Sequence, residues 1–308
     1  MKNYLLAGLV VFILSCSNTK KMKEASADTG KQTYVQGDID KQGHRGCRGL
    51  MPENTVPAML HALGMGVTTL EMDVVITKDK KVILSHEPWF GKEITTKPDG
   101  KYIGEREERT YNIYWMTYEQ TKTFDVGMKP HPRFPQQQKM KVTKPLLADV
   151  IDSIKVDMMT RRRPFPFYNI ETKTNPEFDG VFHPKPEEFV ELLMAVIKEK
   201  QIEDFVIIQS FDFRTLQYLH KQYPAIKTAM LIEDFDKRTL EEQVKALGFT
   251  PTIYSPAYKL VTEDLLKKCH SQNMKVIPWT VNDKATIDKL KEMGVDGIIT
   301  DYPNLFSE

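Results

Sequence analysis

The residues best suited to chemistry are acidic side chains that close runs of β-branched, apolar sequence. Glu71 and Asp73 lie two positions apart in one run, so in a strand both side chains leave the same face. Glu171 and Lys173 repeat this spacing in a later run. Two ionised carboxylates on one face repel each other and need a compensating cation. Three carboxylates without a cysteine ligand favour a hard divalent ion, Ca²⁺ or Mg²⁺, over zinc.

A structural salt-bridge network is the alternative for the same charges. Arg45 and Lys173 would then neutralise the carboxylates with no ion bound. The Glu-x-Asp spacing alone is a weak signal, whereas its combination with Glu-x-Lys on a second run favours an ion site. We therefore expect Glu71, Asp73 and Glu171 to hold one divalent cation, and the choice between Ca²⁺ and Mg²⁺ stays open.

Two histidines, His44 and His86, also stand where β-rich runs end. An imidazole with a pKa of about 6.5 takes and gives protons near neutral pH, so this pair favours acid–base catalysis. Arg45 adds a planar fork suited to phosphate, and Lys173 adds a point charge. Two cations, an ion site and two imidazoles together indicate a site for a phosphate ester. Which histidine is the base and which the acid stays open.

Eight short β-rich runs, alternating with amphipathic helical stretches, would position these side chains. The runs are 43–46, 69–75, 168–171, 205–209, 228–232, 252–255, 275–280 and 297–300. Strand–helix alternation predicts a parallel sheet with right-handed crossovers. Without a GxGxxG fingerprint, eight units favour an α/β fold of the closed (β/α)₈ TIM-barrel type over a doubly wound sheet. The candidate residues would then gather at the carboxyl ends of the strands, where such barrels carry their active sites.

The second unit breaks this rhythm. Residues 82–86 predict an extra strand paired back onto the second one, and about sixty residues follow before the next helix. We interpret residues 87–144 as an inserted small subdomain over the barrel mouth. Its many aromatic residues favour a local mini-core, with a substrate-stacking surface as the alternative.

The N-terminus resembles an export signal. Ten apolar-rich positions, 5–14, are too few to span a bilayer but suit a signal peptide, and the run ends Ile-Leu-Ser before Cys16. This indicates a bacterial lipoprotein signal over residues 1–16, with Cys16 lipidated; an ordinary secretory signal is the alternative. Residues 17–41 are polar and predict a disordered tether. The barrel domain would span residues 42–308, exported and anchored to a membrane, facing the periplasm or the cell exterior.

Composition excludes several classes of protein. The 308 residues carry 43 Lys or Arg against 42 Asp or Glu, a net charge of +1, which argues against a nucleic-acid partner. With 41% hydrophobic and 28% charged residues, the chain is typical of a globular protein. Three cysteines are too few for a disulfide framework. Oligomeric state is not indicated.

Taken in order, these motifs resemble the glycerophosphodiester phosphodiesterase family. The resemblance runs from about Gly43 to Tyr302. Its blocks are His44-Arg45-Gly46, Glu53-Asn54-Thr55, Glu71-Met72-Asp73, His86, Glu171-Thr172-Lys173, Gln209-Ser210-Phe211, Trp279-Thr280-Val281-Asn282 and Asp296-Gly297-Ile298-Ile299-Thr300-Asp301. There are two departures from the family pattern. Polar Asp40-Lys41-Gln42 stands where the first strand usually has an apolar lead-in, and Glu87 rather than Asp follows the second histidine.

The resemblance implies a TIM barrel with an insertion, one divalent ion on the three carboxylates, and the two histidines as an acid–base pair. Trp279 and Phe211 would pack against the glycerol side of the substrate, with a role in the core as the alternative. Glu53 and Asn54 would support the site, with helix capping as their alternative.

The implied activity is metal-dependent hydrolysis of small glycerophosphodiesters to glycerol phosphate and an alcohol, by histidine acid–base catalysis. One alternative is a phospholipase of the same barrel that acts on sphingomyelin or on intact or lyso phospholipids, which would need an exposed apolar rim near the insertion. Another is a non-catalytic lipoprotein that binds phosphate esters. The leaving alcohol is not indicated.

Overall fold

A computed structural model describes residues 39–307. The predicted signal peptide, its Cys16 and the tether as far as residue 38 lie outside the described residues. Within the described range, no helix combines the length and the apolar character needed to cross a membrane.

The strands form one parallel barrel with an antiparallel addition. Neighbouring strands follow the order β8-β7-β6-β5-β4-β2-β1-β9, and β3 lies off this path, paired with β2. Backbone hydrogen bonds from Val281 to Ile299 and from Ile299 to Pro278 join the segment after β8 to β9 and close the circle. The bounds are β1 Asp40–Gly43, β2 Thr69–Ile76, β3 Val82–Leu84, β4 Phe167–Thr172, β5 Val206–Ser210, β6 Lys227–Ile232, β7 Ile253–Pro256, β8 Lys275–Val276 and β9 Gly297–Thr300.

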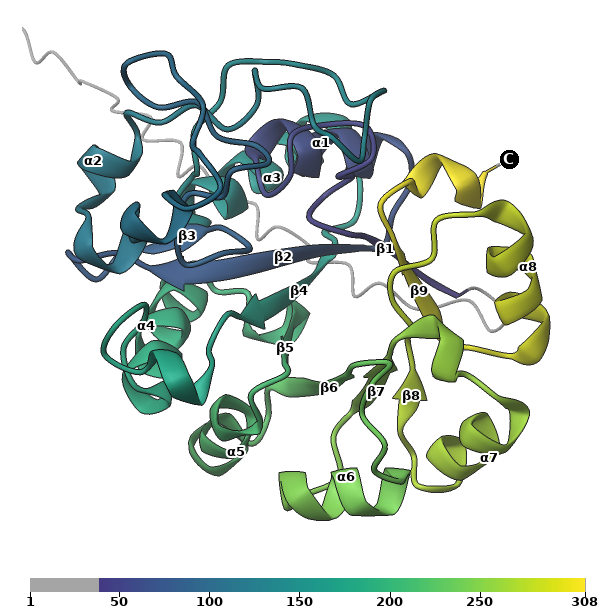
Figure 1. Ribbon diagram of the computed structural model, residues 1–308. Helices are drawn as coiled ribbons and strands as arrows, with labels where there is room; N and C mark the ends of the chain where they lie inside the picture. The colour runs from purple at the N-terminus through teal and green to yellow at the C-terminus, as the bar shows by residue number, and fades with distance from the viewer. Residues whose placement is uncertain (1–38, 308) are drawn as a thin grey trace, which may run out of the picture.

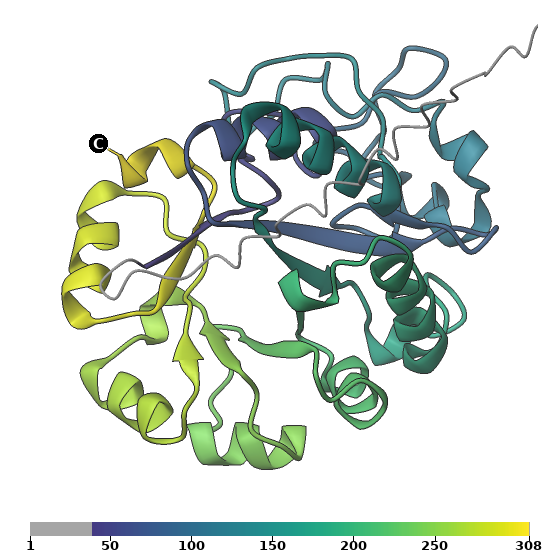
Figure 2. The same cartoon turned by 180° about the vertical axis from the view of Figure 1, so that it is seen from behind.

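Helices surround these strands as an outer ring (Figures 1 and 2). The predicted (β/α)₈ TIM barrel is therefore confirmed. Most helices follow a strand and pack their apolar stripe on the sheet. Their bounds are α1 Val56–Gly64, α2 Tyr118–Thr121, α3 Leu147–Arg161, α4 Pro186–Glu199, α5 Phe213–Gln222, α6 Leu240–Leu247, α7 Glu263–Ser271 and α8 Lys284–Met293.

The first strand was predicted too late in the chain. It spans Asp40–Gly43 rather than 43–46, so the ordered barrel begins before the predicted start at residue 42, within the predicted tether. A search for apolar runs missed the start of this strand, because Asp40 and Gln42 are polar. Both are buried inside the barrel through hydrogen bonds. Asp40 accepts hydrogen bonds from Thr68, Thr69 and Gln42, at 2.6–2.7 Å. The run 275–280 likewise contributes only the two strand residues Lys275–Val276.

Strand alternation sorts side chains between the barrel interior and the helices. On β2, Leu70, Met72 and Val74 belong to the core under the helices, whereas Glu71 and Asp73 face inward. A second apolar cluster fills the interior on the later strands; it comprises Ile207, Ala229, Ile253, Ile277 and Ile299. The interior is therefore apolar on one side and acidic on the other, and the acidic side supplies the candidate site.

The connection between β3 and α3 is long and contains α2 and two short 3₁₀ helices, Glu108–Thr110 and Ile113–Trp115. It lies beside β2 and β3, in blue to teal (Figure 1). Phe90 and Phe124 stack at 4.1 Å inside a small apolar cluster of its own. That cluster comprises Val75, Ile83, Phe90, Ile103, Ile113, Phe124 and Val126.

Candidate active site

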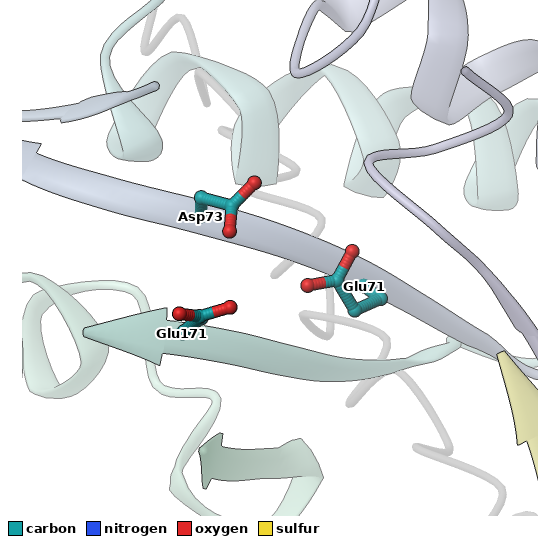
Figure 3. Close-up of side chains that lie close together, drawn as sticks. All are labelled: Glu71, Asp73 and Glu171. Carbon is teal, nitrogen blue, oxygen red and sulfur yellow. The ribbon is translucent and has the colours of Figure 1, made fainter. Parts of the chain in front are cut away.

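Three carboxylates from two neighbouring strands converge inside the barrel (Figure 3). Glu71 and Asp73 come from β2 and Glu171 from β4, where Glu171 is paired in register with Asp73. One oxygen of each lies within 4.8 Å of the others. All three residues are at least 93% buried, Glu171 being the most exposed at 7%. We call these residues the acidic cluster.

Hydrogen bonds fix the outer oxygens of this acidic cluster. The Arg45 backbone N–H donates to Glu71 Oε2 at 2.7 Å, and Gln209 Nε2 donates to Glu71 Oε1 at 2.8 Å. Asn54 Nδ2 donates to Asp73 Oδ2 at 2.8 Å. Asp73 Oδ1 is buried and has no hydrogen-bond partner. A buried carboxylate oxygen that accepts no hydrogen bond and lies beside two further carboxylates fits a hard divalent cation.

Two cations also contact the cluster. Lys173 Nζ lies 2.6 Å from Glu171 Oε1 and 3.7 Å from Asp73 Oδ1, and Arg45 Nε lies 3.3 Å from Asp73 Oδ2. The predicted salt-bridge alternative is therefore present in part. Three carboxylates still outnumber two cations. A divalent ion would give the group one net positive charge, which complements the single negative charge of a phosphodiester.

The pKa shifts show how unfavourable the uncompensated charges are. Burial, followed by repulsion from Asp73, raises the pKa of Glu71 well above its usual value. Burial also raises the pKa of Glu171 to about 7, although Lys173 opposes the change. Without a bound cation, protonation of Glu71 and Glu171 therefore removes part of the excess negative charge.

His44 follows β1 and is oriented by a carboxylate from the other end of the chain. Its Nδ1 lies 2.6 Å from Asp301 Oδ1, while its Nε2 lies 3.9 Å from Glu71 Oε2. Asp301 in turn accepts hydrogen bonds from Arg48 Nε at 3.0 Å and Asn282 Nδ2 at 2.7 Å. Burial lowers the pKa of His44, while Asp301 opposes this. The neutral ring therefore donates from Nδ1 and keeps a free lone pair on Nε2.

His86 follows β3 and has a carboxylate partner of its own. Its Nδ1 lies 2.8 Å from Glu87 Oε1. Burial, with Arg45 and Lys173 adding repulsion, lowers the pKa of His86 well below its usual value. Glu87, the residue that departs from the family pattern, is thus the partner that orients this imidazole.

Both histidines line one cavity of about 590 Å³, which we call the main cavity. Arg45, Glu71 and Glu171 line the same space. A second hollow of about 770 Å³, the side cavity, shares His86 and Glu171 and is lined by Lys173. The structure thus brings the predicted histidines, cations and carboxylates together at the carboxyl ends of the strands.

A sharp turn after β1 positions the remaining predicted residues. Arg45 NH1 donates to Glu53 Oε1 at 2.8 Å, and Asn54 binds Asp73 as described above. Thr55, rather than Glu53 or Asn54, caps α1 by accepting from the Ala58 backbone N–H. The capping alternative is therefore wrong for both residues, since they contact the site instead.

The turn itself depends on a glycine. Gly46 has a φ of +84°, and an added Cβ would lie 2.7 Å from the Ala58 carbonyl carbon. A side chain at this position would strain the backbone and clash with α1. The turn therefore requires glycine directly after Arg45.

Trp279 forms an apolar wall of the main cavity. Its Nε1 donates to the Ser255 carbonyl at 2.9 Å, and its ring meets Phe211 edge-on at 5.4 Å. Phe211 also lines the main cavity. This wall suits the carbon atoms of a small polyol.

The sequence analysis gave no role to Asp301, Arg48 or Gln209, although Asp301 and Gln209 belong to its motif blocks. Asp301 directly follows β9, so the rule that polar residues close strands would have found it. Gln209 lies near the end of β5, where the same rule applies. Arg48 lies in an irregular turn, and no spacing indicated its contact with a carboxylate 253 residues away.

Comparison with known proteins adds independent information. The model of the glycerophosphoryl diester phosphodiesterase family matches residues 44–305. A glycerophosphodiester phosphodiesterase from Bacillus altitudinis is 30% identical over 268 residues, covering 85% of this chain and 94% of the relative.

Solved structures agree. A provisionally assigned glycerophosphoryl diester phosphodiesterase from Silicibacter pomeroyi aligns with a TM-score of 0.78 and 29% identity, over 88% of this chain and 92% of that one. An Oleispira antarctica phosphodiesterase, solved with its product sn-glycerol-3-phosphate, aligns with a TM-score of 0.68 and 20% identity, over 88% of this chain and 98% of that one.

Proposed function

Since the chain belongs to the glycerophosphoryl diester phosphodiesterase family and is thus a phosphoric diester hydrolase, we propose that it hydrolyses glycerophosphodiesters to glycerol phosphate and an alcohol. The observation that carries this proposal is that His44 and His86 line the main cavity together with two carboxylates of the acidic cluster, Glu71 and Glu171. A phosphodiester needs charge neutralisation and proton transfer at one place, and this cavity offers groups for both.

The acidic cluster would hold one divalent cation, either Ca²⁺ or Mg²⁺, since both prefer oxygen ligands. When bound, such an ion neutralises charge on a phosphoryl oxygen and lowers the pKa of a coordinated hydroxyl. Glu71, Asp73 and Glu171 would be its protein ligands, and the unpaired Asp73 Oδ1 supports this assignment.

Arg45 and Lys173 would bind the phosphoryl oxygens. Both side chains already lie at the cluster, so the substrate needs only to approach them. The Lys173 ammonium has three donors, and Arg45 Nε is buried without a hydrogen-bond partner. The glycerol carbons would pack against Trp279.

His44 would act as the general base, taking a proton at Nε2 either from water or from a glycerol hydroxyl, whose attack would form a cyclic phosphate that water then opens. Asp301 supports this role because its carboxylate accepts a hydrogen bond from the His44 Nδ1–H and stabilises the imidazolium that forms. His86 would protonate the departing alcohol. The negative charge of the substrate raises the pKa of His86 in the complex, and Glu87 stabilises its charged form.

A lipid substrate has weaker support. Tyr102, Trp115 and Met128 are exposed on the connection between β3 and α3, but none of them lines either cavity. The exposed apolar residues that do line a cavity, Phe211 and Phe235, follow β5 and β6 rather than lying in the insertion, so the three residues of the connection give no support to a lipid-binding rim there.

The location of the enzyme is proposed from the sequence alone. We keep the proposal of an exported lipoprotein in which Cys16 carries the lipid that attaches the chain to a membrane. Metabolic labelling with a radioactive fatty acid tests it, because Cys16→Ser should abolish the label and release the protein from membranes.

The activity is tested with purified protein, Ca²⁺ or Mg²⁺, and glycerophosphocholine. We expect glycerol phosphate and choline as products, with much slower release from sphingomyelin and lysophosphatidylcholine. His44→Ala should remove activity, whereas His61→Ala, at an exposed histidine on α1, should not. Tight binding of glycerophosphocholine without turnover would contradict the proposal and support the non-catalytic alternative.

A further inference from the structure

Lys144 is a buried cation that the proposed mechanism does not use. It closes the long connection between β3 and α3, is only 5% exposed, and lines the main cavity. Its Nζ donates one hydrogen bond, to Ser85 Oγ at 2.8 Å. The carboxylates of Glu53, Glu87 and Asp73 attract this ammonium through space, although its hydrogen bond goes to the hydroxyl. Burial lowers the pKa of Lys144 to about 8, so the position is unfavourable for a charged side chain.

The partner of Lys144 stands at a junction of the site. Ser85 Oγ donates to the Glu87 carbonyl at 2.5 Å, and the Ser85 backbone N–H donates to the Asp73 carbonyl at 3.0 Å. His86 lies between Ser85 and Glu87, and Glu87 Oε1 accepts from its imidazole. The chain Lys144–Ser85–Glu87 therefore spans the turn that carries His86.

The backbone around Lys144 is itself fixed against the barrel. Leu146 forms an antiparallel bridge with Ile83, and the Leu84 N–H donates to the Pro145 carbonyl at 2.9 Å. The segment thus extends the pairing of β3 by one further strand-like edge. Lys144 is held beside the His86 turn by main-chain pairing as well as by its side chain.

We propose that Lys144 is a positioning residue for His86: its ammonium fixes the Ser85 hydroxyl, which in turn fixes the Glu87 carbonyl and the conformation of the turn between them. This rests on the proposed function, in which His86 protonates the leaving alcohol. An unbranched apolar residue would pack against Phe90, whose ring centroid lies 5.4 Å from Lys144 Nζ, without the cost of burying a charge. The lysine contributes a donor that such a residue lacks. Its location ties the end of the long connection to the geometry of the reaction.

Steady-state kinetics of three single variants and one double variant test this inference. Lys144→Met removes the donor, Lys144→Gln keeps an N–H donor on a side chain as long as that of Met and one bond shorter than that of Lys, and Ser85→Ala removes the link. We expect Lys144→Met and Ser85→Ala each to lower kcat about tenfold with KM within about twofold, since the turn acts on proton transfer rather than binding. Lys144→Gln should lose about threefold. The double variant Lys144→Met/Ser85→Ala should lose no more kcat than the less active of its two single variants, because both substitutions break the same chain of hydrogen bonds.

A matched control is Lys97→Met. Lys97 lies on the same connection and is half-buried, but its Nζ pairs with Glu107 at 3.8 Å and it lines neither cavity. It should keep kcat within about twofold. Thermal unfolding of each variant distinguishes a loss of folding from a displaced His86 in a folded protein. If Lys144→Met fails to fold, Ser85→Ala tests the inference instead.

A raised KM with unchanged kcat in Lys144→Met would overturn the inference, because the ammonium would then bind substrate directly. Additive losses in the double variant, or an equal loss in Lys97→Met, would overturn it as well. His86→Ala is measured in parallel. Wild-type kcat in His86→Ala would refute the proposed role of that histidine, whereas normal kcat in Lys144→Met alone refutes only this inference.

Discussion

The contact between His44 and Asp301 offers the sharpest test of the proposed base. Asp301→Asn conserves shape but removes the charge that accepts from His44 Nδ1 at 2.6 Å. A hydrogen bond to a charged group contributes about 1.5–3 kcal/mol. If that contribution is lost only in the transition state, where His44 becomes an imidazolium, kcat/KM falls about 10- to 150-fold, at 1.36 kcal/mol per tenfold.

The pH profile should change in a direction that the structure fixes. Burial already lowers the pKa of His44, and Asp301 opposes this. Removing the Asp301 charge therefore lowers the His44 pKa further. The base must be deprotonated to act, so the rising limb of kcat/KM should move to lower pH while the plateau drops.

The assay is choline release from glycerophosphocholine between about pH 5 and 9, with the folded fraction determined by thermal unfolding. Arg48 also loses a charged partner in this variant, so a lower Tm is expected. Asp283→Asn is the control, because Asp283 caps α8 and asparagine caps equally well. A kcat/KM for Asp301→Asn within twofold of wild type would refute the role of Asp301.

Three further predictions concern the second histidine, the ion and the core. His86→Ala should lower kcat at least about a hundredfold with Tm near wild type, since the partly exposed ring contributes to proton transfer rather than to core packing. Turnover assays and calorimetry check this. Divalent-ion affinity should rise with pH through about pH 7, because burial raises the pKa of Glu71 well above its usual value and that of Glu171 to about 7, and the ion must displace their protons. Calorimetric titration of wild type and Glu171→Gln measures this, and the slope should be shallower in the variant. Ile208→Ala should cost about 2–5 kcal/mol of unfolding free energy, measured in urea, with little change in activity per folded molecule, since Ile208 packs under the helices and not in the site.

The sequence predicts the barrel well where strands are apolar and end in polar residues. Runs such as 205–209 and 297–300 matched the structure within a residue at each end. The first strand failed the same test, because Asp40 and Gln42 are buried through hydrogen bonds rather than hydrophobicity. Local patterning cannot show a partner such as Asn169, which is distant in the chain and donates to Gln42.

The site was predictable in its composition but less so in its internal contacts. The spacing of Glu71 and Asp73 required a shared face, and strand pairing then brought Glu171 beside them. By contrast, Asp301 contacts a histidine 257 residues away, and Lys144 contacts a serine 59 residues away. Such contacts depend on barrel closure and on the path of the long connection. Neither produces a spacing of residues that can be recognised in the local sequence.

The dependence of hydrolysis on a divalent ion tests the central claim most directly. Glycerophosphocholine turnover is measured after exhaustive treatment with EDTA and again after stepwise addition of Ca²⁺ or Mg²⁺. The acidic cluster predicts turnover near background in chelator and recovery with at least one of the two ions, but no recovery in Glu171→Gln at the same ion concentration. Full turnover in chelator would contradict the assignment of Glu71, Asp73 and Glu171 as ion ligands.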